Sequence, residues 1–171
     1  MEKVLKIIFS TVIVVLSFVL QLLVIDNMNL FGVRPNLFLI SIIVVCLNTD
    51  IYISTFFSFI IGVIVDMLFG AGGLFTISYT IIGMLLGFVN EDYMKENLLS
   101  ISILTGISTI LFELVQYIKS MIVISKYISI FFFLKQLIIS ILLNVIIVVI
   151  ICFIFRKIME KIYKKQDKLY W

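Results

Sequence analysis

Two carboxylic acids, Asp66 and Glu113, lie inside long apolar stretches, where an ionisable group is positioned to do chemistry. A buried acid can transfer protons, hold a metal ion or form half of a catalytic pair. Each role needs partner groups, and the chain has no histidine and only two cysteines, Cys46 and Cys152, in separate apolar runs. No recognisable cluster of serine with lysine, paired aspartates or histidine with glutamate is present. The sequence therefore predicts a non-enzymatic protein without a metal or other cofactor.

Small residues accompany Asp66 at helical spacing. The residues that follow a four-residue spacing are Gly62, Asp66 and Gly70, and then Tyr79, Gly83 and Gly87. Residues four apart share one face of an α-helix. Small residues on such a face let membrane helices approach closely, and an acid in a membrane segment normally faces the bundle interior or a watery cavity. Because Gly70 and Gly73 permit a sharp reversal, we expect a tightly packed helical hairpin over residues 60–87.

The composition indicates that this hairpin lies in a membrane. Hydrophobic residues make up 63% of the 171 residues and charged residues 13%, whereas soluble domains are roughly half apolar. A spanning helix needs about 20 apolar residues, so the chain has room for one membrane domain, residues 1–171. We predict an all-α integral membrane protein with six transmembrane helices. The expected helices cover approximately residues 5–25, 35–49, 51–69, 74–89, 98–118 and 136–155, with an interfacial segment at about 121–134.

Polar residues on three of these helices follow helical spacing. The sets are Ser10, Ser17 and Gln21 on the first helix; Ser102, Gly106, Thr109, Glu113, Gln116 and Ser120 on the fifth; and Gln136, Ser140 and Asn144 on the last. Polar stripes of this kind point into a membrane bundle. Contacts between helices explain them more simply than a transport pathway does.

Basic residues set the expected orientation. The last sixteen residues contain Arg156, Lys157, Lys161, Lys164, Lys165 and Lys168, and Lys3 and Lys6 lie at the start. The positive-inside rule places both termini in the cytoplasm, which requires an even number of spans. We expect the tail, residues 156–171, to contact anionic lipid rather than nucleic acid. Five spans with an outer N-terminus is the alternative, because Lys119, Lys126 and Lys135 would lie outside in the six-span arrangement.

Arg34 and Asp66 lie on the same outer side in the six-span arrangement. An acid near hydrocarbon is costly unless it is paired or neutralised. We therefore expect Arg34 either to form an ion pair with Asp66 or to anchor the chain at a lipid headgroup.

The order of these residues resembles the family of the rod shape-determining protein MreD. The resemblance rests on Pro35 and Asn36 opening the second helix, Gly62-x-x-x-Asp66 on the third, Gly70 and Gly73 in the turn, and Tyr79 and Gly83 on the fourth. Length, six apolar segments and the basic C-terminus agree over the whole chain. Family members often have an acid after the proline, where this chain has Asn36, and Gly-Leu where it has Gly62-Val63.

The resemblance implies a membrane subunit of the bacterial elongation machinery, located in the cytoplasmic membrane. MreD-like proteins work with the single-span protein MreC, the actin-like MreB, the polymerase RodA and a class B penicillin-binding transpeptidase. They help to organise lateral peptidoglycan synthesis. The resemblance also implies a fold similar to that of the substrate-binding subunits of energy-coupling-factor vitamin transporters, which have six helices too.

Such a transporter subunit is the main alternative function. These subunits typically carry an Ala-x-x-x-Ala motif on the first helix, whereas the single alanine of this chain is Ala71. The expected outer loops also lack the tryptophan and histidine of a vitamin pocket, since the one tryptophan is Trp171. A small channel would need a continuous polar lining, for which one stripe gives little support. The sequence therefore favours a scaffold.

Overall fold

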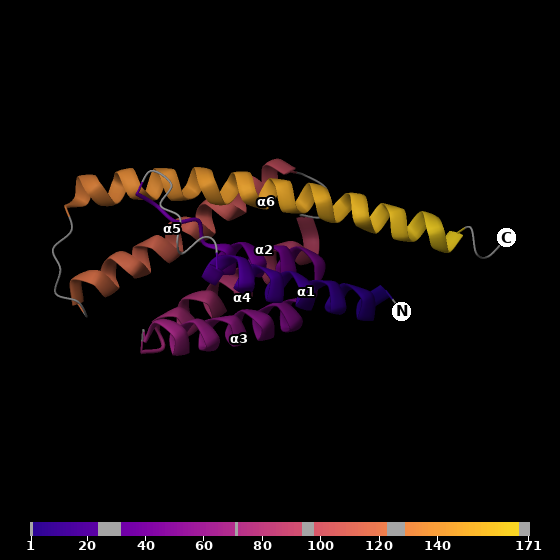
Figure 1. Ribbon diagram of the computed structural model, residues 1–171, viewed down its shortest axis with the longest axis horizontal. Coiled ribbons are helices and arrows are strands. Elements are labelled where there is room, and N and C mark those ends of the chain that lie inside the picture. Colours follow the sequence, from indigo (N-terminus) through magenta and orange to yellow (C-terminus); the bar gives the residue numbers. More distant parts are fainter. Residues whose placement is uncertain (1, 24–31, 71, 94–97, 123–128, 168–171) are drawn as a thin grey trace.

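The structure is a computed structural model that describes residues 2–23, 32–70, 72–93, 98–122 and 129–167. The described residues form six α-helices: α1 (Glu2–Leu23), α2 (Leu37–Asn48), α3 (Ile51–Phe69), α4 (Leu74–Tyr93), α5 (Leu98–Ile122) and α6 (Ile130–Asp167). Successive helices alternate in direction, and the start of α1 and the end of α6 lie at the same end of the bundle (Figure 1). The opposite end, where residues 70–73 connect α3 to α4, is called the turn end below. The predicted all-helical class is confirmed.

The helices expose large apolar side chains, and small polar side chains are buried beside the apolar core. Phe88 and Leu99 are each 71% exposed, whereas Ser41 and Ser54 are completely buried. Three segments are long and apolar enough to cross a membrane, namely α3, Leu98–Met121 of α5 and Ile130–Ile154 of α6. The apolar parts of α1, α2 and α4 are shorter. An apolar exterior, with small polar side chains between the helices, is typical of a bundle solvated by lipid.

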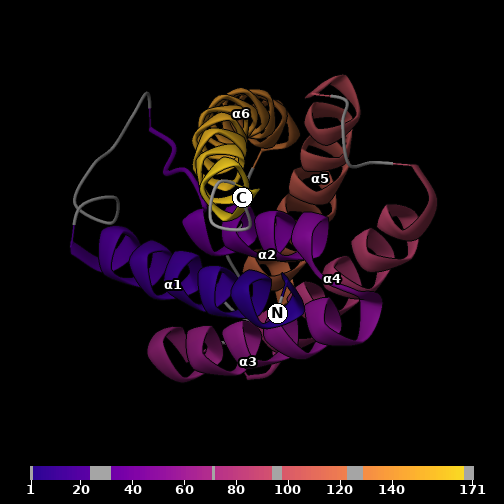
Figure 2. The same cartoon turned by 90° about the vertical axis from the view of Figure 1, so that its right-hand side faces the viewer.

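Helix α2 is the centre of the bundle. It contacts each of the other five helices, which surround it in Figure 2, and Leu37–Cys46 are all buried. A helix that is apolar on every side belongs in a core. Its 12 residues rise roughly 18 Å, well short of the roughly 30 Å of bilayer hydrocarbon. At least one end of α2 therefore needs protein partners for its unpaired backbone groups.

The start of α2 differs from the sequence prediction. The helix begins at Leu37 rather than at Pro35, because Asn36 is extended and its Oδ1 accepts a hydrogen bond of 3.0 Å from the Leu39 N–H. This is the geometry of a helix N-cap. Pro35 therefore precedes the cap and does not occupy the first helical position.

Helices α4, α5 and α6 also extend beyond their predicted limits. Helix α4 continues through 90–93, past its predicted end at 89, and α5 continues to Ile122. Helix α6 begins at Ile130, so residues 130–134 start a long helix, and the tail stays helical to Asp167. Lys and Glu are good helix formers, so a change from apolar to charged residues marks the membrane surface without ending the helix. The predicted features at 24–31, 71, 94–97, 123–128 and 168–171 lie outside the described residues.

The predicted inward faces agree in part with observed burial. The polar residues of α1 are buried, as are two of the three on α6. On α5 only Thr109 of the predicted stripe is buried, and the other five members are half-buried. The buried face of α5 instead runs through Ile101, Thr105, Ser108 and Phe112. The stripe therefore borders the core face of α5 and does not coincide with it.

Candidate functional site

Helices α3 and α4 make the most extensive contact of any helix pair, and small residues allow it. A Cβ atom added to Gly62 would lie 2.5 Å from the Cα atom of Thr76. A Cβ atom at Gly87 would lie 2.5 Å from Ser54 Oγ and 3.0 Å from the Cα atom of Ile51. At Gly83 the added atom would clash with Ser58. We call this contact the α3–α4 seam.

Two seam residues were not predicted from the sequence. Ser54 and Ser58 are completely buried, and they continue the four-residue spacing back from Gly62 and Asp66. The Ser58 hydroxyl donates to the Ser54 carbonyl at 2.7 Å, and the Ser54 hydroxyl donates to the Ile51 carbonyl at 3.0 Å. Both hydroxyls are thus satisfied by their own helix. The signal in the sequence was the spacing of all small residues, not of glycines alone.

Asp66 joins the two helices of the hairpin at the turn end. Its Oδ1 accepts a hydrogen bond of 3.2 Å from the Phe75 N–H, and its Oδ2 accepts one of 2.7 Å from the Thr76 N–H and another from the Thr76 hydroxyl. The first N–H groups of a helix lack partners within it and attract negative charge. The start of α4 therefore supplies hydrogen-bond donors to this carboxylate, and the ion pair of Asp66 with Arg34 stays a prediction.

Glycines shape the turn beside Asp66. Gly70 ends α3 with a φ of 60° in the left-handed region, and its N–H donates to the Asp66 carbonyl at 2.8 Å. Gly73 has a φ of 91°. Residues with a Cβ atom rarely adopt these angles, so glycine is the favoured residue at both positions.

A second polar group gathers where α2 begins. The Asn36 N–H donates to Asn144 Oδ1 on α6 at 3.0 Å, and the Leu37 N–H donates to Gln21 Oε1 on α1 at 2.8 Å. The Leu39 N–H donates to Asn36 Oδ1. The N–H groups that start a helix have no partner inside it, and here side chains from three parts of the chain supply partners. We call these residues, with Tyr79 and Thr109, the α2 cap cluster.

The α2 cap cluster reaches two further helices. Asn36 Nδ2 donates to the Tyr79 hydroxyl on α4 at 2.9 Å, and Asn144 Nδ2 donates to Thr109 Oγ1 on α5 at 3.2 Å. Tyr79 is 1% exposed. Its ring is nearly parallel to that of Phe112, with centroids 5.1 Å apart. One cluster therefore ties α1, α2, α4, α5 and α6 together.

A small hollow of about 170 Å³, lined by both apolar and polar side chains, lies beside this cluster. Its polar lining consists of Gln21, Arg34, Asn36, Tyr79, Glu113 and Gln116. Glu113 accepts a hydrogen bond of 2.7 Å from Ser140 on α6. The structure thus brings Arg34, Pro35, Asn36, Tyr79 and Glu113 together around the hollow. The predicted glycines and Asp66 lie instead along the α3–α4 seam and its turn.

Among the described residues, no group of three or more histidine, cysteine, aspartate or glutamate side chains could hold a metal ion. The interior polar groups are arranged as helix caps and helix contacts.

Residues 1–162 match the family model of the rod shape-determining protein MreD. The chain belongs to the MreD family. The resemblance inferred from Pro35, Gly62, Asp66 and the later glycines is therefore confirmed. MreD is a family of shape-determining structural membrane proteins and is not known for an enzymatic activity. No curated protein and no solved structure matches the chain.

Proposed function

We propose that this MreD-family chain is a non-enzymatic scaffold subunit of the bacterial elongation machinery and binds an MreC-like single-span protein. Through this partner it would act with a RodA-like polymerase, a class B penicillin-binding transpeptidase and an MreB-like actin to organise lateral peptidoglycan synthesis. Family membership supports a role in determining rod shape. The supporting observation is that Asp66, Asn36, Gln21 and Asn144 each bond to the start of a helix.

These bonds favour architecture over chemistry. A transporter or an enzyme keeps polar groups available for a substrate, at a cost in stability. The Asp66 carboxylate instead accepts three hydrogen bonds from α4. The side-chain amides of Gln21, Asn36 and Asn144 likewise accept hydrogen bonds from backbone N–H groups at the start of α2. A rigid frame is the property that a scaffold needs, because an ordered surface costs less entropy when a partner binds.

We further propose six membrane spans with both termini in the cytoplasm. The alternating helix directions and the shared end of α1 and α6 support an even number of spans (Figure 1). Helix α2 would be short for a span, but its capped start allows it to remain inside the bundle. The basic end of α6 would then contact anionic lipid on the cytoplasmic side.

The outer face of α3 is the surface that we propose for the MreC-like partner. Tyr52, Phe56 and Phe59 are 85%, 61% and 48% exposed and follow helical spacing. Together with Thr80 and Met84 of α4 they line a shallow groove. Aromatic and methionine side chains are enriched in protein interfaces. The face also belongs to the closely packed α3–α4 hairpin, so it is presented in a fixed shape to a partner helix.

Copurification from membranes tests the partner and the surface together. Replacing Phe56 and Phe59 by alanine should lower recovery of an MreC-like protein about tenfold, because buried interface aromatics often contribute more than 1 kcal/mol each. Phe153→Ala on α6 is the matched control, since Phe153 is also 61% exposed. Equal recovery with all variants would reject this surface. Recovery of paired ATPases with a vitamin instead would reject the scaffold.

The hollow keeps the vitamin-transporter subunit as a second candidate function. A basic side chain, Arg34, and an acidic one, Glu113, both line it. Its volume of about 170 Å³, however, is below the roughly 300–1,000 Å³ of ordinary ligand pockets. A vitamin at 100 times its Kd should stabilise the protein by about 2.7 kcal/mol. Thermal unfolding with a panel of vitamins, repeated with Glu113→Gln, would reveal such a ligand.

A further inference from the structure

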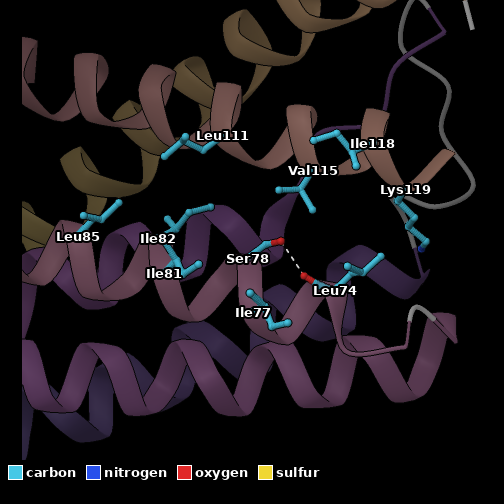
Figure 3. A pocket seen from close by; sticks show the side chains of 10 residues that line it. All are labelled: Leu74, Ile77, Ser78, Ile81, Ile82, Leu85, Leu111, Val115, Ile118 and Lys119. Atoms are coloured by element: carbon cyan, nitrogen blue, oxygen red, sulfur yellow. Dashed lines mark hydrogen bonds between the residues drawn. The ribbon is translucent and has the colours of Figure 1, made fainter. Parts of the chain in front are cut away.

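An apolar groove of about 450 Å³ runs between α4 and α5. Helix α4 contributes lining side chains from Leu74 to Leu85, and α5 contributes lining side chains from Leu111 to Lys119 (Figure 3). The Ser78 hydroxyl donates to the Leu74 carbonyl at 2.6 Å. The side-chain hydroxyl in the groove is thus already bonded, so the walls favour an apolar occupant.

The two ends of the groove differ in charge. Lys119 lies at the same end as Leu74, towards the turn end, and Leu85 lies at the other (Figure 3). Lys119 is the one residue with a charged side chain among the described residues that line the groove. Its ammonium group lies over the ring of Phe75, 4.5 Å from the centroid. This cation–π contact places the positive charge at the mouth of the groove.

The dimensions of the groove suit one hydrocarbon chain. From Leu74 to Leu85 the helix rises roughly 17 Å, about half of the roughly 30 Å hydrocarbon layer, which is the depth of one leaflet. The walls of the groove are aliphatic along this whole length. An extended, unbranched hydrocarbon chain can therefore lie along the groove within one leaflet.

We propose that this groove binds an anionic phospholipid, with one acyl chain between α4 and α5 and the phosphate at Lys119. The aliphatic walls exclude the headgroup from the groove, and the Lys119 ammonium group at its mouth selects a negative charge over a neutral one. The site lies at the turn end, opposite the basic end of α6. The lipid bound there therefore belongs to the opposite membrane leaflet from the lipid that the tail contacts. It is separate from the aromatic α3 face proposed for the protein partner.

Native mass spectrometry of the full chain, titrated with phosphatidylglycerol or phosphatidylcholine, tests the site. We expect one tightly held phosphatidylglycerol per chain and weaker retention of phosphatidylcholine. Lys119→Gln should weaken phosphatidylglycerol binding about fivefold, the equivalent of about 1 kcal/mol for one lysine near the membrane surface. Lys135→Gln is the control, because exposed Lys135 lies in the first turns of α6, also near the turn end, and does not line the groove.

A second pair of variants tests the acyl chain separately from the charge. Ile81→Trp should fill the groove and abolish retention of either lipid, whereas Ile107→Trp on α5 should not. The two isoleucines are 52% and 50% exposed, so neither change strains the core, and thermal unfolding would verify the fold. Equal binding by both tryptophan variants, or equal retention of the two lipids, would overturn the proposal. The proposal would also be overturned if Ile81→Trp lowered copurification of the MreC-like protein and left lipid binding unchanged, because the groove would then hold the partner.

Discussion

Asp66 and Asn36 do the same work at two different helix starts. Each supplies side-chain oxygen to backbone N–H groups that begin a helix, Asp66 for α4 and Asn36 for α2. In water such groups could bond to solvent, but in hydrocarbon an unpaired N–H group costs several kcal/mol. Polar residues such as Asp66, which in the sequence could be taken for reactive groups, are therefore needed here as acceptors for backbone N–H groups.

Replacing Asp66 tests the cap directly. Asp66→Ala leaves two backbone N–H groups of α4 without their partner, so we expect a loss of about 2–3 kcal/mol in the free energy of unfolding. Asp66→Asn keeps one oxygen acceptor and should lose about 1 kcal/mol. Denaturation in mixed micelles would measure both. An unchanged midpoint for Asp66→Ala would show that the cap contributes nothing.

Replacing Asn36 separates its cap from its contact with Tyr79. Asn36→Ala removes both and should cost about 2–3 kcal/mol. Asn36→Asp keeps the Leu39 bond and removes the Nδ2 donor, but the Tyr79 hydroxyl, which already donates to Asn36 Oδ1 at 3.2 Å, can donate to the carboxylate, so we expect a cost below about 1 kcal/mol. A double-mutant cycle with Tyr79→Phe checks this, because that hydroxyl should contribute more in the N36D background. Equal losses for the alanine and aspartate variants would contradict the donation from Tyr79 to the carboxylate.

At the scale of elements, spacing predicted the hairpin but not its neighbours. The bounds of α3 agree with the prediction, and its end is set by Gly70, which adopts the left-handed conformation there. The approach of Gly62 to Thr76 follows from small residues four apart. The cap of α2 could not be predicted, because Gln21 and Asn144 are distant in sequence and only the tertiary fold brings them to one backbone segment. The exposed grooves could not be predicted from the sequence either, because their positions depend on where two helices diverge in the fold.

A glycine series tests the seam. Gly62→Ala would place a methyl group 2.5 Å from the Thr76 Cα atom, and backbone cannot move aside as a side chain can, so we expect a loss of about 1–3 kcal/mol. Gly106→Ala on α5 is the control, because its nearest neighbour would be Ile141 Cγ2 at 3.8 Å. That variant should be neutral or up to about 1 kcal/mol more stable, since alanine favours helix. Thermal unfolding in detergent would compare them, and equal stabilities would contradict close packing at the seam.

At the scale of the whole molecule, a short central helix is supported by its surroundings. Helix α2 contacts every other helix, and the start of its backbone is satisfied by α1 and α6. The longer helices around it present apolar side chains outwards. This arrangement fits a bundle in which the ring of outer helices meets the lipid while the centre need not reach either membrane surface.

The orientation of this bundle gives the last prediction. Single cysteines at Glu2, Ser129 and Gln166 would report the two ends of the bundle without removing any basic residue, and Cys46 and Cys152 are buried. In intact cells an impermeant thiol reagent should label Ser129→Cys alone, because six spans place the turn end outside. Glu2→Cys and Gln166→Cys should react only after the membrane is permeabilised. Labelling of Glu2→Cys but not of Gln166→Cys in intact cells would establish an odd number of spans, and labelling of both would establish the inverted orientation of an even number.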